Sequence, residues 1–131
     1  MASILLAEDD DAVRAFVKRA LESAGHRVDT AEDGGEAMET LARKRGAYDL
    51  LVSDIKMPMM DGIALALNTA RDWPEVKILL MTGYADQRER AFGLDELVEE
   101  VVQKPFSLTD IRDAVERALG LSHEAGRSAY G

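Results

Sequence analysis

Hydrophobic residues along this 131-residue chain fall into short apolar runs that alternate with longer stretches of helical periodicity. The short runs predict buried β-strands, which we expect at residues 3–7, 26–30, 50–53, 76–81 and 99–102. In the stretches between them, apolar residues recur every three to four positions, and this spacing predicts amphipathic helices. We expect the helices at residues 11–24, around 37–42, from 61 to about 70, at 86–92 and at 108–119.

Local signals mark the ends of two of these helices. Gly25 follows the last apolar position of the first helix, where glycine commonly ends a helix. Asp10 and Asp11 precede the same helix, and we expect them to serve as its N-cap and first-turn residue. Ser107 and Asp110 resemble a capping box at the start of the last helix.

Strands and helices alternate five times, and this order predicts an α/β fold. Such alternation favours a doubly wound, five-stranded parallel sheet that is flanked by five helices on its two faces. The length suits one compact domain, which we expect over residues 1–120. Residues 121–131 have no periodicity and contain two glycines, so we expect a flexible C-terminal tail.

Composition and charge narrow the classes of function. Hydrophobic residues make up 47% of the chain, which is enough for a core and argues against disorder. The net charge of -9 argues against a nucleic-acid partner, because the densest basic cluster, Arg43-Lys44-Arg45, falls where a helix is expected to end. There are no cysteines for disulfides or thiolate metal sites, and no apolar run is long enough to span a membrane. A cytoplasmic location follows as the default.

Polar residues gather where the expected strands end. The first strand is followed by the acidic run at residues 8–11, the third by Asp54, the fourth by Thr82 and the fifth by Lys104. Each has a structural explanation when taken alone, because acidic residues suit a helix start, an aspartate can turn the chain, a threonine can cap a helix and a lysine is usually solvated. Together they lie at the edge of a parallel sheet where ligands bind.

The combination favours phosphoryl-transfer chemistry. Clustered carboxylates repel one another unless a cation compensates them, and oxygen ligands suit Mg2+. A carboxylate, a metal ion, a hydroxyl and an ammonium that converge on one point are the groups needed to transfer a phosphoryl group to an aspartate.

At these residues the chain resembles the receiver domains of response regulators. The resemblance covers about residues 3–120, and motifs of this order and spacing are specific to that family. The matching segments are Ile4-Leu-Leu-Ala-Glu-Asp9, Leu51-Val-Ser-Asp54-Ile-Lys-Met-Pro58, Asp61-Gly62-Ile63, Leu80-Met-Thr82-Gly83 and Lys104-Pro105-Phe106.

The resemblance implies a strand order of 2-1-3-4-5 and a role for each matched residue. Asp54 is the expected phosphoacceptor. Mg2+ is expected on Glu8, Asp9, Asp54 and the backbone carbonyl of Lys56, with Asp9 a more direct ligand than Glu8. Thr82 and Lys104 are expected to contact phosphoryl oxygens.

Three positions carry expectations that are specific to this chain. Val101 stands where many receivers have an aromatic switch residue, so the expected partner surface of helix four, strand five and helix five must respond to Thr82 by another route. Lys56 and Tyr84 occupy the positions that flank the path of an attacking water, and we expect them to slow dephosphorylation.

These features predict a phosphorylation-controlled binding module and not an enzyme in the usual sense. The expected phosphodonor is a phosphohistidine of a histidine kinase or phosphotransferase, and the expected output is an unidentified partner protein. The missing aromatic and the segment Met81-Thr-Gly-Tyr-Ala85 resemble the stand-alone CpdR-like regulators, which favours a regulated-proteolysis adaptor that binds a protease component, or else a phosphorelay carrier.

Three alternative functions fit these residues less well. A pseudo-receiver that binds partners constitutively usually lacks one of the site residues, and all of them are present here. A phosphohydrolase commonly needs a carboxylate two residues after the nucleophile, where this chain has Lys56. A nucleotide or flavin site is disfavoured because the turn after the first strand is acidic and would repel phosphate.

Overall fold

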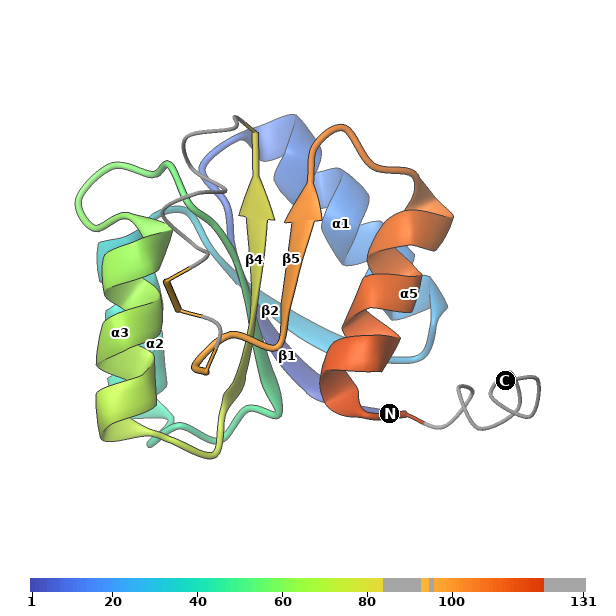
Figure 1. The fold of residues 1–131 in the computed structure, drawn as a ribbon. Helices are drawn as coiled ribbons and strands as arrows, with labels where there is room; N and C mark the ends of the chain where they lie inside the picture. Colours follow the sequence, from blue (N-terminus) through green and yellow to red (C-terminus); the bar gives the residue numbers. More distant parts are fainter. Residues whose placement is uncertain (84–92, 95, 122–131) are drawn as a thin grey trace.

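All five expected strands form one parallel sheet in the computed structural model, in the order β2-β1-β3-β4-β5 (Figure 1). The strands are β1 (Ser3–Ala7), β2 (Arg27–Ala31), β3 (Leu50–Asp54), β4 (Lys77–Thr82) and β5 (Glu100–Gln103). The structure describes residues 1–83, 93–94 and 96–121. The predicted doubly wound sheet and its strand order are therefore confirmed.

Four helices in the described part of the chain cover the two faces of the sheet. Figure 1 shows α1 (Asp11–Ser23) and α5 (Leu108–Leu119) on one face, and α2 (Gly34–Arg43) and α3 (Gly62–Asp72) on the other. The expected helix at residues 86–92 and the tail after residue 121 lie outside the described residues.

Alternation along the central strands produces two cores, one under each helical layer. In β1, Ile4 and Leu6 pack with α1 and α5, whereas Leu5 and Ala7 pack with residues of α2 and α3. All four side chains are fully buried. Because both faces are covered, the strand is apolar from Ile4 to Ala7, which is why a continuous run and not an alternating pattern marks it in the sequence.

Four strands begin or end one residue away from the apolar runs that predict them. β3 continues to Asp54, which pairs with Met81, and β4 continues to Thr82, which pairs with Gln103. Backbone pairing does not require an apolar side chain, so the strands extend past the hydrophobic run. This extension places the polar residues inside the edge of the sheet rather than in the loops.

The predicted helix caps are confirmed. Asp10 caps α1 and accepts hydrogen bonds from the backbone N–H groups of Ala12 and Val13. At the start of α5, Ser107 and Asp110 each accept a hydrogen bond from the other's backbone N–H, which completes the capping box.

His26 lies just before β2 and is buried against the N-terminus. Its Nδ1 accepts a hydrogen bond from the backbone N–H of Ala2 at 3.1 Å. Its burial, followed by the nearby N-terminal amino group, lowers the pKa of this imidazole. The histidine therefore anchors the first strand.

No helix within the described ranges has the length and apolar character needed to cross a bilayer.

Candidate functional site

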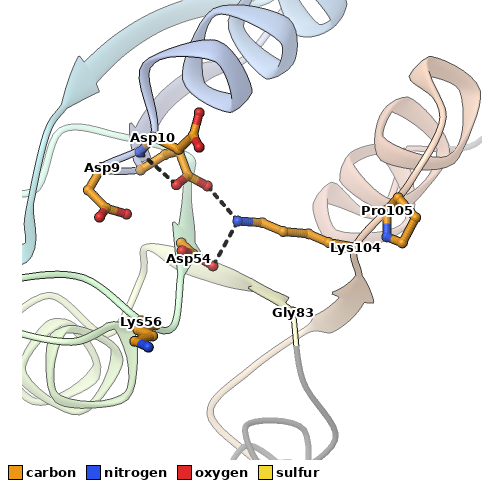
Figure 2. A pocket seen from close by; sticks show the side chains of 8 residues that line it. Asp9, Asp10, Asp54, Lys56, Gly83, Lys104 and Pro105 are labelled. Carbon is orange, nitrogen blue, oxygen red and sulfur yellow. Dashed lines mark hydrogen bonds and ion pairs between the residues drawn. The ribbon is translucent and has the colours of Figure 1, made fainter.

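The carboxyl ends of β1, β3, β4 and β5 and the residues that follow them form a cleft of about 490 Å³ (Figure 2). Its lining combines acidic and basic side chains with a glycine and a proline: Glu8, Asp9, Asp10, Asp54, Lys56, Gly83, Lys104 and Pro105. All but Asp10, Gly83 and Pro105 are residues expected to form the site. The cleft therefore lies at the strand ends, where polar residues gather in the sequence.

Three carboxylates converge in this cleft. Glu8 is fully buried, Asp54 is 6% exposed and Asp9 is exposed, and one oxygen of each lies within 4.8 Å of one oxygen of the others. Backbone hydrogen bonds hold the first of them, because the N–H of Glu8 donates to Ala31 and Glu8 Oε2 accepts from the N–H of Asp10. The group offers only oxygen donors, which suits a hard divalent cation.

Lys104 bridges two of the carboxylates across the cleft (Figure 2). Its Nζ lies 3.0 Å from Glu8 Oε1 and 3.2 Å from Asp54 Oδ1. The side chain of Lys104 is 24% exposed, so its ammonium remains accessible from the open side of the cleft. The arrangement partly neutralises the clustered acids and holds a cation beside Asp54.

Thr82 ends β4 with its side chain fully buried. Its Oγ1 has no hydrogen-bond partner among the residues that the structure describes. Its backbone carbonyl accepts from the N–H of Lys104 at 2.7 Å, so the threonine is tied to the segment that carries the lysine. A buried hydroxyl without a partner is unfavourable, and a ligand oxygen would satisfy it.

The electrostatics of the cleft favour a bound cation. Burial raises the pKa of Glu8, and the charge of Asp54 adds to the effect. Burial also raises the pKa of Asp54, with a further contribution from Asp9. For Lys104, burial opposes the charge, but the hydrogen bond to Glu8 and the charge of Asp54 outweigh it and raise the pKa. The carboxyl groups of Glu8 and Asp54 therefore bind a proton more readily than exposed carboxyl groups do, while Lys104 keeps its positive charge.

The chain matches the response regulator receiver domain family over residues 4–116. It belongs to this family. The expected resemblance is therefore confirmed, and with it the assignment to two-component signalling.

Relatives of known name agree with this assignment. The chain is 39% identical over 119 residues to the response regulator receiver protein CpdR of Brucella abortus, which covers 91% of this chain and 98% of that protein. It is 38% identical over 121 residues to the sensor kinase CckA of the same organism, which covers 90% of this chain but only 12% of that protein.

A solved receiver structure is similar to this chain in both fold and sequence. The response regulator TrrA of Thermotoga maritima, described as a complex with Mg(2+)-BeF, has a TM-score of 0.79 and 30% sequence identity and covers 90% of this chain and 99% of that one.

Of the three positions with expectations specific to this receiver, the structure describes Lys56 and Val101. Lys56 has an exposed side chain and lines the cleft, whereas Tyr84 lies outside the described residues. Val101 in β5 is partly buried against the cluster that contains Ile55 and Leu80. Val101 therefore packs on the core next to the end of β3, whereas the expected helix at residues 86–92 lies outside the described residues.

Sequence reasoning missed two residues that position the receiver's acidic groups. Arg14, in the first turns of α1, donates from its guanidinium to the backbone carbonyl of Glu8 at 2.8 Å and pairs with Asp11. Gly62 packs so closely on β3 that a Cβ there would overlap the carbonyl oxygen of Asp54. An arginine within a helix gives no signal of this contact in the sequence, whereas the glycine was part of a motif whose physical reason appears only in the packing.

Proposed function

We propose that this receiver accepts a phosphoryl group on Asp54 from a phosphohistidine and thereby switches its binding to a partner protein. The observation that carries the proposal is the Lys104 ammonium, which is held between Asp54 and Glu8 in a cleft that also contains Asp9. Such a site presents a nucleophilic carboxylate together with groups that can neutralise phosphoryl oxygens.

The oxygen donors of Glu8, Asp9 and Asp54 fit Mg2+, with the backbone carbonyl of Lys56 as a further ligand. When bound, Mg2+ would offset the carboxylate charge and order the phosphoryl oxygens. The buried Thr82 hydroxyl, which has no partner among the described residues, suits an additional oxygen at the same place.

Transfer requires one bond to form and one to break. A carboxylate oxygen of Asp54 attacks the phosphorus, and the N–P bond breaks with its electron pair left on the donor imidazole, which takes up a proton. Lys104 stays beside Asp54 and balances the charge of the transferred group, and the Thr82 hydroxyl donates a hydrogen bond to a phosphoryl oxygen. The product is an aspartyl phosphate and a neutral histidine.

An apolar surface next to the cleft suits a protein as the phosphodonor. It is formed by the start of α1 and the segment after β5, and it is lined by Ala12, Val13, Phe16, Pro105 and Phe106 beside Lys104. Phe16 is 41% exposed, and its ring centroid lies 6.4 Å from that of Phe106. Exposed aromatic residues of this kind commonly anchor protein interfaces, so we place the histidine-bearing donor here.

The donor for this test is a phosphorylated histidine phosphotransferase that labels the wild type. Phe16→Ala is expected to slow phosphoryl transfer from this donor by about tenfold, because an anchor of the interface is lost. Labelling by acetyl phosphate should stay unchanged, because a small donor does not use the surface. Leu67→Ala is the matched control, since Leu67 is 46% exposed on α3, on the opposite face of the sheet. Equal slowing with both donors would contradict the docking role.

Output is proposed to act through another protein, as a regulated-proteolysis adaptor or a phosphorelay carrier in the cytoplasm. The similarity to CpdR along nearly the full length of that protein supports a receiver domain over residues 1–120 whose output passes through a separate protein. The partner surface is proposed to include β5 and α5, where a shallow pocket is lined by Val101, Phe106 and Arg117 among others.

Loss of the phosphoryl group is expected to be slow, because the exposed Lys56 side chain lines the cleft and can cover the approach of an attacking water. Lys56→Asn should speed the decay of the aspartyl phosphate by about threefold to tenfold. The rate is measured by intact mass after removal of the donor. Lys44→Asn, an exposed lysine at the end of α2, is the control. An unchanged decay rate in Lys56→Asn would remove the proposed shielding.

A further inference from the structure

The loop between β3 and α3, residues 55–61, carries Lys56 into the cleft and is closed on itself by short backbone hydrogen bonds. The N–H of Gly62 donates to the carbonyl of Ile55 at 2.7 Å, and the N–H of Met60 donates to the carbonyl of Pro58 at 2.8 Å. A loop this short and internally bonded moves as a unit. A displacement of its far side therefore reaches Lys56.

The far side of this loop rests on the first residue of α2. A Cβ on Gly34 would overlap the carbonyl oxygen of Met60 and lie 2.7 Å from the Met60 Cβ. Asn68 of α3 adds a contact from its amide nitrogen to the Met60 sulfur at 3.7 Å. Because the atoms that face Gly34 belong mainly to the backbone, rotating a side chain could not make room for a methyl group.

We infer that Gly34 is a positioning residue for the cation site, since it allows α2 to hold the 55–61 loop where Lys56 lines the cleft beside the carboxylates. This inference rests on the proposed Mg2+ site and adds to it an element that contributes no ligand. Gly34 lies on α2, outside the cleft, and is buried beneath the loop. Groups that hold metal ligands in position without contacting the metal commonly change metal affinity by about 10- to 100-fold when they are altered.

The glycines of this chain supply two controls. Gly35 is the next residue of α2, where a Cβ would meet only the Asp33 carboxylate at 3.3 Å and the Met59 Cβ at 3.7 Å. Gly46 has a positive φ of 69°, and a Cβ there would overlap the Trp73 ring, where α2 and α3 end and not where they begin near the 55–61 loop. Gly35→Ala thus tests the same helix without the clash, and Gly46→Ala tests a comparable clash at another place.

The experiment measures Mg2+ affinity by calorimetry in wild type, Gly34→Ala, Gly35→Ala and Gly46→Ala, together with urea unfolding of each. Gly34→Ala is expected to weaken Mg2+ binding about tenfold, whereas the two controls keep wild-type affinity even though Gly46→Ala is less stable. In metal-free protein, the amide NMR shifts of residues 55–61 should change in Gly34→Ala and stay in place in Gly46→Ala.

The outcomes separate this inference from the proposed function. If the wild type itself binds no Mg2+, the proposed site fails. If the wild type binds Mg2+ and Gly34→Ala binds it equally well, or if Gly46→Ala loses affinity to the same extent, the positioning role is overturned. Should Gly34→Ala fail to fold, Met60→Gly removes the Cβ that packs on Gly34 and loosens the loop. Wild-type Mg2+ affinity in that variant would equally overturn the inference.

Discussion

Asp54→Asn is expected to reduce phosphorylation by acetyl phosphate to background, a loss on the order of 10³-fold or more, as removal of an essential nucleophile produces. The carboxylate lies in the cleft beside Lys104, and an amide oxygen at the same place is too weak a nucleophile. The measurement is the intact mass of protein incubated with acetyl phosphate and Mg2+, and the wild type should lose its label when Mg2+ is chelated.

The matched control is Asp72→Asn, because Asp72 ends α3 and pairs with Arg71 on the surface. It should be labelled like the wild type. A label that survives in Asp54→Asn would mean that another residue accepts the phosphoryl group. A wild type that takes no label from acetyl phosphate or from a phosphohistidine donor would instead favour a constitutive interaction domain.

The same substitution has an expected effect on stability without metal. Because burial and then Asp9 raise the pKa of Asp54, the folded protein binds this proton more readily than the unfolded chain. The free energy of unfolding therefore falls as the pH rises from the ordinary value of 3.8 through the raised folded pKa, and the penalty persists at neutral pH. Asp54→Asn should unfold at higher urea than the wild type at neutral pH in the presence of a chelator, and its stability should depend less on pH.

Lys104→Met is expected to lower the rate of phosphoryl transfer about 100-fold while it tightens Mg2+ binding about tenfold. The ammonium balances the charge of the transferred group, but it also occupies the space between Glu8 and Asp54 that a cation would enter. Without metal the variant should lose about 1–3 kcal/mol in its free energy of unfolding. The reason is that the buried Glu8 carboxylate loses its ion pair with Lys104, which is only partly exposed.

Lys18→Met is the control for loss of one positive charge, since Lys18 lies on α1 with an exposed side chain that faces Glu22. It should change neither Mg2+ affinity nor transfer rate by more than about twofold. Weaker Mg2+ binding in Lys104→Met, measured by calorimetry, would show that the lysine assists the cation and does not compete with it.

Much of the fold and the cleft could be predicted from the sequence because the signals are local. Apolar runs such as that of Ile4 to Ala7 define buried strands, and residues such as Asp54 and Thr82 stand at their ends. The contact of Gly34 with Met60 could not be predicted, because it joins two elements whose distance depends on how α2 and α3 pack. The pairing of Phe16 with Phe106 is hidden for the same reason, since both residues look like ordinary core positions in their own segments.

The hydrogen bond between Ala2 and His26 has a practical consequence for how the protein is prepared. Ala2 is buried, whereas Met1 is 92% exposed, so an affinity tag joined before Met1 leaves the first strand in place. Such a tag nevertheless replaces the free amino group, whose charge contributes after burial to lowering the pKa of His26. A tag without a charge at this place would remove that contribution, so the pKa of His26 should be lowered less in tagged protein than in the chain that starts at Met1.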